Sequence, residues 1–434
     1  MAPQVGFRYI DGHLHCDGVP VRDVVARHGT PCYLYSGGVL RQRFERIREA
    51  FGRWDPLVCF SVKSLGNLSV LKLLGEAGSG FDVVSGGELY RVIEAGGDPS
   101  LAVYAGVGKT RPEIEYALEA GVHMFNVESA AEMRAINEVA TELGCTAPVA
   151  IRVNPDVDPR THAKTTTGKK ENKFGISIPA AHRLGVETKE MPGVVLHALH
   201  VHLGSPIYSA DPYVEALKKV VKLRRELAGE GAPTEAVNLG GGYCMSYTGE
   251  PVIGPQEYAE AVGPILEKME CRVIIEPGRH ISAPAGILLV GVTYRKQREY
   301  GKKFVITDGG MNDLMRPTLY EAFHRIWPAD SARGMPKVMK PDACGYDGFE
   351  TEIVDVVGPI CESGDYLAKD RALPPVDEGE VLAVFDAGAY GFTMSSTYNA
   401  QPRPPEVLVR EGAPHPARGR ETYEDLVRSE KQCL

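Results

Sequence analysis

The sequence predicts an α/β protein, in which a (β/α)8 barrel of the TIM type is joined to a separate β domain. From about residue 58 to residue 278, eight short β-rich runs alternate with amphipathic helical patterns, which is typical of a parallel sheet with helical crossovers. The eight units cover ~220 residues, close to the ~250 residues typical of such a barrel. A doubly wound open sheet is the alternative, but no GxGxxG fingerprint follows the first predicted strand.

The predicted strands are short and mostly apolar, and the intervening helices have apolar residues at helical spacing before a terminal glycine. The strands are Val58–Lys63, Gly80–Ser85, Ala102–Gly106, Met124–Ser129, Val149–Pro155, Leu196–Leu203, Ala236–Gly242 and Cys271–Gly278. The helices are Leu68–Gly78, Gly87–Gly96, Glu113–Gly121, Ala130–Gly144 and Tyr213–Gly229.

Beyond residue 286 the pattern changes to Val- and Ile-rich strands with few helices between them, which indicates a β-sandwich or β-barrel-like domain. Its predicted strands are Gly286–Arg295, Lys303–Asp308, Glu352–Val357 and Glu380–Asp386. The N-terminal segment, with short strands and Asp-Gly turns, is expected to join this domain. The expected division is therefore 1–35, 36–285 and 286–434, with a surface helix and a frayed end after Glu411.

Composition disfavours several classes of partner. The net charge of −9 speaks against nucleic acid, because binding phosphate backbones needs a basic face. No apolar run approaches the ~18–20 residues of a membrane span, and the N-terminus lacks a signal-peptide pattern. Nine scattered cysteines without a CxxC pair indicate neither a zinc site nor a disulfide framework. We therefore expect no metal, no nucleic acid, no membrane and a cytoplasmic setting.

Lys63 ends the first predicted strand, in the sequence CFSVK. An ammonium at the end of a buried strand is costly unless it is paired. A desolvated lysine has a lowered pKa, becomes a nucleophile and can hold an aldehyde cofactor as a Schiff base. The common alternative is a lysine whose ammonium only reaches solvent. The residues at the ends of the other predicted strands can distinguish these two interpretations.

Polar residues gather where the predicted strands end. The carboxyl ends of barrel strands meet at one rim, which carries the active site in this fold. So many polar residues are hard to explain by packing alone. They are Lys63, Asp82, Ser85, Asn126, Glu128, Arg152, Asn154, His200, His202, Asn238, Gly240–Gly242, Glu276 and Arg279.

Two glycine loops follow the seventh and eighth predicted strands, at 240–242 and 276–279. Backbone N–H groups of such loops can form a nest for phosphate, and these loops are the usual phosphate site of a barrel. A tight turn is the alternative. Glu276 ends an apolar run and needs a partner. That partner is either an arginine such as Arg279 or the ring nitrogen of pyridoxal phosphate (PLP), which an acid keeps protonated.

His200 and His202 lie two residues apart, on one face of the sixth predicted strand. Two such histidines could ligate zinc, but no HExxH or comparable pattern accompanies them. Stacking of a histidine on a cofactor ring is the favoured interpretation, and a hydrogen-bonded core histidine is the alternative for His200.

The chain resembles the fold-type III PLP-dependent decarboxylases, which share an alanine racemase-like barrel, and among them the diaminopimelate decarboxylase family. The resemblance spans nearly the whole chain in the order of the family. The matching segments are SVK at 61–63, GFDVVSGGELY at 80–90, RVNP at 152–155, ENKFGI at 171–176, HLGS at 202–205, GGG at 240–242, EPGR at 276–279, NDLMRPTLY at 312–320, GPICESGD at 358–365 and GAYGFTMSSTYN at 388–399.

This resemblance implies a PLP site in which Lys63 anchors the cofactor as a Schiff base, His202 stacks on the ring and Glu276 faces the pyridine nitrogen. Ser205, Gly241, Gly278 and Tyr390 would hold the phosphate. The whole set expected to bind PLP is Lys63, Asp82, Arg152, His202, Ser205, Gly241, Glu276, Gly278, Arg279 and Tyr390.

The resemblance also implies a homodimer with shared active sites, in which Cys361 is the proton donor and reaches in, with Glu362, from the partner subunit. The residues expected to bind the amino-acid substrate are Arg279, Arg316, Tyr320, Glu362 and Tyr390. Two arginines can clamp a carboxylate, and a glutamate can accept an ammonium. This set favours decarboxylation of meso-2,6-diaminopimelate to L-lysine and CO2, the last step of lysine biosynthesis.

Other activities remain open. Ornithine, arginine, carboxynorspermidine or a carrier-bound amino acid could be the substrate of a related decarboxylase. A PLP racemase would need two opposed acid–base groups, which fits the Cys361 loop less well. A non-catalytic homologue that binds partners should lose Lys63 or Cys361, and this chain has both.

The chain departs from the family pattern at two positions. Ser64 and Leu65 follow the lysine where the family usually has Ala-Asn, and Pro206 follows Ser205 where the family usually has glutamine. Neither change removes a group needed for decarboxylation. Both put in doubt the hydrogen bonding around the ring and the cofactor affinity.

Overall fold

The computed structural model describes residues 5–158, 173–299 and 301–434. The first two residues of the ENKFGI segment, 171 and 172, lie outside the described residues. The chain divides into two compact units. The barrel unit consists of Gln42–Cys244 and Val252–His280, and the β unit of Met1–Arg41, Met245–Pro251 and Ile281–Leu434.

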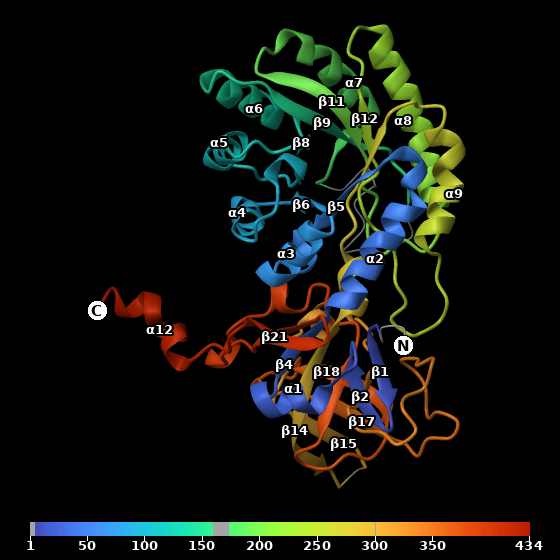
Figure 1. The fold of residues 1–434 in the computed structure, drawn as a ribbon, viewed down its shortest axis with the longest axis vertical. Helices are drawn as coiled ribbons and strands as arrows, with labels where there is room; N and C mark the ends of the chain where they lie inside the picture. The colour runs from blue at the N-terminus through green and yellow to red at the C-terminus, as the bar shows by residue number, and fades with distance from the viewer. Residues whose placement is uncertain (1–4, 159–172, 300) are drawn as a thin grey trace. The chain divides into compact units, whose positions relative to one another are not determined.

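The barrel unit contains a closed ring of eight parallel strands, which confirms the predicted (β/α)8 fold. Figure 1 labels several of these strands, among them β5, β6, β9 and β12. The ring closes because β13 pairs with β5, with Ile274 opposite Leu57, while β9 pairs with β8 and β11. The short β10 (Ile176–Ser177) extends the edge of β9. In ring order the strands are β5 (Leu57–Ser61), β6 (Gly80–Val83), β7 (Ala102–Tyr104), β8 (Met124–Val127), β9 (Ala147–Asn154), β11 (Val194–His200), β12 (Ala236–Asn238) and β13 (Arg272–Ile275).

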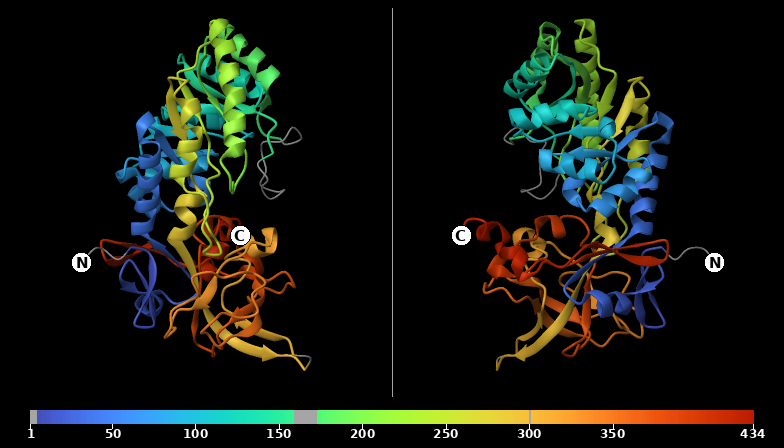
Figure 2. Two further views of the ribbon diagram at one scale, coloured as in Figure 1. Left: turned by 90° about the vertical axis from the view of Figure 1, so that its right-hand side faces the viewer. Right: turned by 60° about the vertical axis from the view of Figure 1, so that its left-hand side comes forward.

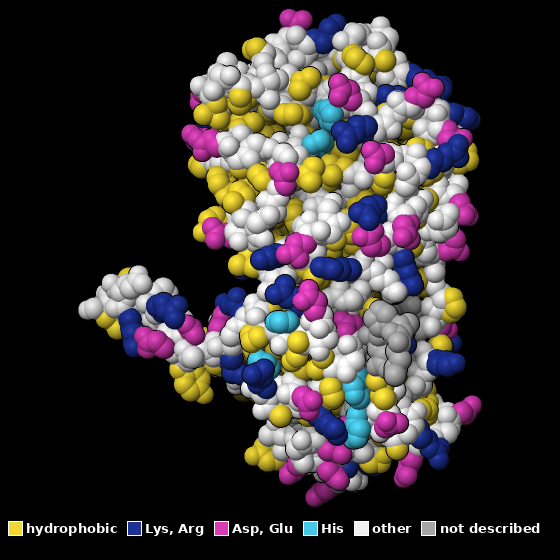
Figure 3. Space-filling view, viewed as in Figure 1, with side chains coloured by type: hydrophobic (Ala, Val, Ile, Leu, Met, Phe, Trp, Pro, Cys, Tyr) yellow, Lys and Arg dark blue, Asp and Glu magenta, His cyan; other side chains and the backbone are white. Residues whose placement is uncertain are grey.

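Helices cover the outside of the barrel, as both views of Figure 2 show. Asn67, Ser85 and Ser129 set the starts of three of them by accepting first-turn N–H groups. On the face shown in Figure 3, Lys and Arg side chains are interspersed with Asp and Glu. The helices are α3 (Leu68–Glu76), α4 (Gly86–Glu94), α5 (Arg111–Glu119), α6 (Ala130–Glu142), α7 (Ile178–Glu187), α8 (Asp211–Gly229), α9 (Pro255–Leu266) and most of α2 (Gly37–Ala50).

The centre of the barrel is a packed core, as expected for this fold. Seven strands each contribute one buried side chain to it, and Leu57 packs against the cluster. The seven are Cys59, Val103, Met124, Ala150, Ala198, Ala236 and Ile274.

The β unit contains a second large sheet with the order β18-β17-β15-β14-β4-β20-β21, and β19 joins β14 to β16. β4 (Cys32–Ser36) lies between β14 and β20, which confirms that the N-terminal segment completes the C-terminal β domain. A small sheet holds β1 (Phe7–Ile10), β2 (His13–Cys16) and β3 (Val19–Pro20). The other strands are β14 (Gly286–Gln297), β15 (Lys303–Thr307), β16 (Ile326–Pro328), β17 (Glu352–Val357), β18 (Tyr366–Leu373), β19 (Val381–Val384), β20 (Glu406–Arg410) and β21 (Ala413–Arg418).

Some elements differ from the prediction. β5 ends at Ser61, where its ladder with β6 ends opposite Asp82, so Lys63 lies in a 3-10 turn (Val62–Ser64) just beyond the strand. The expected surface helix, α12 (Tyr423–Lys431), is preceded by the unpredicted β21. Among the described residues, no helix has the length and apolarity to cross a membrane.

Candidate active site

A polar layer follows the apolar core of the barrel toward the C-terminal ends of the strands. Residues two apart on a strand lie on the same face. On six strands the core residue is followed two positions later by a polar residue, and Asp82 follows Gly80 in the same way on β6. The strands therefore direct these side chains into the mouth of the barrel, where barrel enzymes carry their active sites. The six residues are Ser61, Asn126, Arg152, His200, Asn238 and Glu276.

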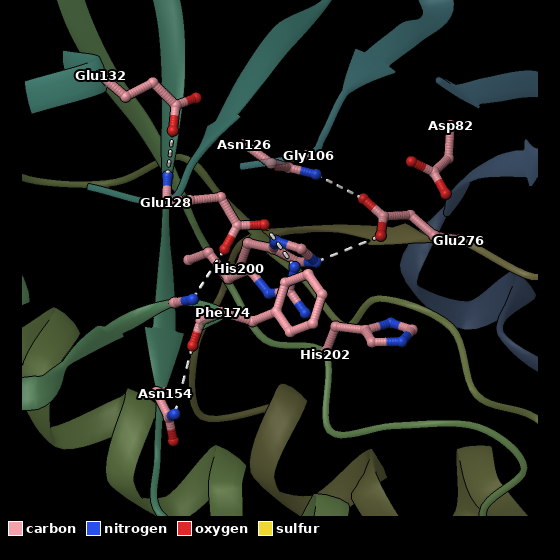
Figure 4. A network of polar contacts seen from close by, with 12 residues as sticks. Asp82, Gly106, Asn126, Glu128, Glu132, Asn154, Phe174, His200, His202 and Glu276 are labelled. Atoms are coloured by element: carbon pink, nitrogen blue, oxygen red, sulfur yellow. Dashed lines mark hydrogen bonds and ion pairs between the residues drawn. The ribbon is translucent and has the colours of Figure 1, made fainter. Parts of the chain in front are cut away.

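Glu276 contacts several other residues of this layer, and Figure 4 shows it between Asn126, His200 and Asp82. Its Oε1 accepts N–H groups from Asn126 at 2.7 Å and Asn238 at 2.6 Å, and its Oε2 lies 3.3 Å from Nε2 of His200. Burial opposes ionisation of this carboxyl, but His200 and Lys63 outweigh burial, so the pKa of Glu276 is lowered. The mouth of the barrel thus holds an ionised carboxylate, paired with a histidine and two amides.

His200 and His202 contact different partners. His200 ends β11 and reaches Glu276, whereas His202 lies beyond the strand and accepts the N–H of Gly241 on Nδ1 at 3.1 Å. Burial, aided by nearby positive charges, holds the pKa of His202 well below its usual value, so its ring is a neutral imidazole. Among the described residues, no cluster of three or more His, Cys, Asp or Glu side chains could hold a metal ion.

Lys63 pairs with Asp82 at the edge of the polar layer. The Nζ of Lys63 donates to Oδ2 of Asp82 at 2.8 Å, and the hydroxyl of Ser61 donates to the same oxygen at 2.7 Å. Asp82 is fully buried, whereas the Lys63 side chain is 35% exposed. Burial raises the pKa of Asp82, against the opposing charge of Lys63. The pair holds the amine in place and leaves it accessible.

Lys109 is a second lysine near the same rim, and its environment is different. Its side chain is only 1% exposed, and its Nζ donates to the carbonyls of Gly106 and Asn126 and to Glu132, at 2.7, 2.9 and 2.6 Å. An ammonium has three donors, so all the donors of Lys109 are used within the fold. Of these two lysines at the rim, Lys63 is the one that combines a carboxylate partner with access to solvent.

The glycine loop after β12 is tied to the polar layer. The N–H of Gly240 donates to Oδ1 of Asn238 at 2.8 Å, and that of Gly241 donates to His202. A Cβ at Gly241 would collide with the carbonyl oxygen of Glu276. This position therefore requires glycine, because the backbone of the loop packs closely against the backbone of Glu276.

The second glycine loop, after β13, lies against the turn that carries Lys63. A Cβ at Gly278 would be 3.0 Å from that of Ser61 and 3.2 Å from that of Ser64. The Nε of Arg279 donates to the hydroxyl of Ser205 at 3.1 Å. This contact joins the EPGR and HLGS segments, both of which were predicted to contact the cofactor.

Arg152 is held at the side of the polar layer. Its Nη1 donates to Oε1 of Glu128 at 2.5 Å, and Oε2 of Glu128 accepts the N–H of Gly175 at 2.8 Å. The guanidinium lies 4.9 Å from the ring centroid of Phe174. Arg152 thus connects β9 to β8 and to residues 173–175.

Five of the predicted site residues belong to the β unit. Two lie in the short helix α11 (Arg316–Tyr320), two are exposed in the loop 358–365, and Tyr390 has a left-handed backbone with φ of 55°. Such strained conformations cluster at functional sites. The five are Arg316, Tyr320, Cys361, Glu362 and Tyr390.

Asp365 anchors the loop that carries Cys361 and Glu362 through hydrogen bonds to two backbone N–H groups. The Asp365 carboxylate accepts the N–H groups of Met311 at 2.7 Å and Ile360 at 2.6 Å. Burial raises the pKa of Asp365, although these two bonds oppose the rise. The loop is therefore a fixed platform, with Cys361 and Glu362 at its exposed tip.

The site combines an ionised carboxylate, Glu276, with an accessible amine, Lys63. It therefore suits a ligand that can form a covalent bond to the amine and that also has a protonated nitrogen for the carboxylate. A pyridine-ring aldehyde has both properties, so the fold and site define a barrel enzyme of the PLP-dependent class. Residues 38–283 match the family described as pyridoxal-dependent decarboxylase, pyridoxal binding domain.

Individual relatives define the family more closely. The chain is 43% identical over 420 residues to the diaminopimelate decarboxylase of Aquifex aeolicus, with 96% of each chain covered. The structure of diaminopimelate decarboxylase from Helicobacter pylori in complex with L-lysine matches with a TM-score of 0.88 at 37% identity, covering 95% of this chain and all of that chain. The enzyme from M. jannaschii, also with L-lysine, matches with a TM-score of 0.89 at 37% identity, covering 98% and 97%. The chain therefore belongs to the diaminopimelate decarboxylase family.

Sequence reasoning placed Asn126, Asn238 and His200 at the rim but did not identify them as the partners of Glu276. Each of them lies two residues after a small or apolar core residue of its strand. This shared spacing could have predicted that the three side chains lie in one layer. Lys109 was missed because it lies in the loop after β7 rather than at the end of a predicted strand.

Proposed function

We propose that this chain is a PLP-dependent carboxy-lyase that converts meso-2,6-diaminopimelate to L-lysine and CO2, the last step of lysine biosynthesis. The observation that carries this proposal is the Lys63–Asp82 pair beside ionised Glu276 in a closed barrel. Membership of the family and the L-lysine in two related structures support the reaction. In this proposal, residues 36–285 form the PLP-binding domain, and 1–35 and 286–434 form the β domain.

The residues at the mouth of the barrel fit PLP. Lys63 offers the amine that anchors an aldehyde, and Glu276 can accept the N–H of a protonated ring. Oδ1 of Asp82 and Oδ1 of Asn126 are buried and have no hydrogen-bond partner among the described residues, which leaves them able to bind a polar ligand. Gly241 and Gly278 lie in the two glycine loops after β12 and β13, and these loops would hold the phosphate.

We assign a separate role in the reaction to each of these side chains. PLP, when bound, supplies the electron sink for the electron pair left by the departing carboxylate. Asp82 orients the amine of Lys63, and Glu276 would hold a proton on the ring nitrogen. The neutral imidazole of His202 would stack on the cofactor ring, and Ser205, Arg152, Arg279 and Tyr390 would complete the cofactor site. The thiol of Cys361 would act as the acid that protonates the substrate carbon after CO2 leaves.

Charged side chains would bind the distal carboxylate and ammonium groups of the substrate. Arg279 and Arg316 would clamp the distal carboxylate, Glu362 would accept the ammonium, and Tyr320 and Tyr390 would complete the pocket. Cys361 and Glu362 are exposed in the single chain. We propose that they act in the active site of a partner subunit, so that the working enzyme is a homodimer.

The test is a substrate comparison with purified, PLP-loaded protein. CO2 release is followed with meso-diaminopimelate and then with ornithine, arginine and carboxynorspermidine. The proposal predicts that kcat/KM for meso-diaminopimelate exceeds the others by at least ~100-fold, since a buried carboxylate clamp left empty costs several kcal/mol. Preference for any of the other amino acids would overturn the substrate assignment.

We also propose a cytoplasmic location. All nine cysteines of the chain are free, and free thiols persist in a reducing compartment. Fractionation of the native host with an antibody to the protein tests this, and recovery outside the cytoplasmic fraction contradicts it.

A further inference from the structure

A buried histidine contacts the arginine that is proposed to clamp the distal carboxylate of the substrate. The Nε of Arg316 donates to Nε2 of His324 at 3.3 Å. His324 is fully buried and Arg316 is only 6% exposed. Both belong to the β unit, so this contact lies within one compact body.

The hydrogen bonds of His324 determine its protonation state. Nδ1 of His324 lies 2.9 Å from the carbonyl oxygen of Phe385, and a carbonyl can only accept, so Nδ1 carries a proton. The Nε of Arg316 can only donate, so Nε2 of His324 must be an unprotonated acceptor. His324 is therefore a neutral imidazole with its proton on Nδ1, and a second proton would place two donors and two positive charges face to face.

Packing holds the imidazole and the guanidinium in one arrangement. The ring of Tyr247 lies edge-on to that of His324, with centroids 5.4 Å apart, and the guanidinium carbon of Arg316 lies 5.3 Å from the Tyr247 ring centroid. Nη1 of Arg371 donates to the backbone carbonyl of His324 at 2.6 Å. Both sides of the Arg316–His324 contact are thus fixed by neighbouring side chains.

This arrangement selects how Arg316 can meet a carboxylate. A guanidinium can form two parallel bonds through its Nε edge or through its terminal amino groups. His324 occupies the Nε edge, so a carboxylate has to approach the terminal end. We propose that His324 is a positioning residue for substrate recognition, which fixes the plane of Arg316 so that its terminal end receives the distal carboxylate of the amino acid. This inference rests on the proposed function, because it takes Arg316 as the carboxylate ligand.

Two substitutions separate this role from a role in folding. In His324→Gln the side-chain oxygen can take the place of Nε2 and accept from Arg316, whereas in His324→Asn the side-chain amide can take the place of Nδ1 and donate to Phe385. Positioning of Arg316 therefore predicts rescue by glutamine and loss with asparagine. A purely structural bond to Phe385 predicts the reverse. His415→Asn, a half-buried histidine in β21 of the same unit, is the control.

The readout is the affinity of the PLP-loaded enzyme for two diamines, measured by calorimetry. L-Lysine carries the carboxylate that Arg316 would bind, and cadaverine lacks it. We expect His324→Asn to weaken L-lysine binding by at least ~10-fold, as for a hydrogen bond to a charged group, and cadaverine binding by less than ~2-fold. His324→Gln should stay within ~3-fold of the parent protein for both ligands.

The outcomes are distinguishable. Equal loss of both ligands in His324→Asn, or weaker L-lysine binding in His324→Gln than in His324→Asn, overturns the positioning role. Arg316→Ala tests the underlying assignment separately. If Arg316→Ala leaves the affinity for L-lysine intact, the proposed carboxylate clamp itself is wrong; if Arg316→Ala weakens it and His324→Asn does not, only the inference about His324 fails.

Discussion

Asn126 and Asn238 donate to the same oxygen of Glu276, one from β8 and the other from β12. This leaves Oε2 to His200 and to any ring nitrogen that enters the site. Two amide donors on one oxygen stabilise the ionised carboxylate, because hydrogen bonds to a charged form favour that form. The electron sink of the proposed reaction therefore depends on two uncharged side chains that never need to touch the substrate.

We predict that Asn238→Ala lowers kcat ~10-fold, since a hydrogen bond to a charged group contributes ~1.5–3 kcal/mol. Asn238→Asp should lower it further, because a second carboxylate beside Glu276 raises the pKa of Glu276 and weakens its hold on a ring proton. The measurement is kcat across pH for both variants. Equal rates in the alanine and aspartate variants would contradict an electrostatic role.

Arg316→Ala should raise KM for meso-diaminopimelate with little change in kcat, because the distal carboxylate lies away from the bond that breaks. The expected loss is ~2–4 kcal/mol in kcat/KM, as for a buried carboxylate without its partner. Steady-state kinetics measure it. Unchanged kinetics would remove Arg316 from the substrate site.

Cys361→Ala should lower kcat by ~10²–10⁴, the usual contribution of a positioned acid. L-Lysine affinity should change little, because proton donation is not part of product binding. Asp365→Asn is the matched variant. One of the two N–H groups of Met311 and Ile360 would then face an amide nitrogen, so the loop should loosen and kcat should fall by an intermediate factor. Normal turnover in Cys361→Ala would identify another proton donor.

His280 should make the barrel unit less stable in acid. It is buried at the start of α10 (Arg279–Ser282), its Nδ1 lies 2.7 Å from the carbonyl oxygen of Cys244, and burial lowers its pKa to about 4. The unfolded chain binds this proton near pH 6.5, so stability is fully present above pH 6.5 and is lost as the pH falls toward 4. The loss amounts to ~3 kcal/mol.

The test is urea unfolding of the parent protein and of His280→Asn between pH 7 and pH 4. Asparagine keeps a donor for the Cys244 carbonyl and does not titrate. The variant should therefore lose less stability than the parent protein below pH 6.5. Parallel curves for the two proteins would show that His280 does not contribute to acid sensitivity.

The barrel could be predicted because its strands are local patterns. Each β-rich run and each helix is readable within ten to twenty residues, and the count of eight limits the topology. β18 and β21 were not predicted, because their sequences YLAKDRAL and APHPAR carry charges, prolines or alanines that hide a strand pattern.

The partners within the site were harder to predict. Glu276 was expected to meet either Arg279 or a ring nitrogen, and the structure places His200, Asn126 and Asn238 around it. These contacts depend on which strands are neighbours in the ring and on their register, and neither is encoded locally. Ser64, where the family usually has alanine, donates to the carbonyl of Ser61 at 2.8 Å, so its hydroxyl is used within the turn that carries Lys63.

The most direct test of the proposed site is to identify the lysine that holds PLP. The holoenzyme is reduced with borohydride, which fixes an imine as a stable amine, and its peptides are mapped by mass spectrometry. If Lys63 anchors the cofactor, a pyridoxyl group is expected on Lys63 alone, and Lys63→Ala should lose both this modification and the absorbance at ~420 nm. A pyridoxyl group on Lys109, the other lysine at the rim, or no stable modification at all, would contradict this assignment.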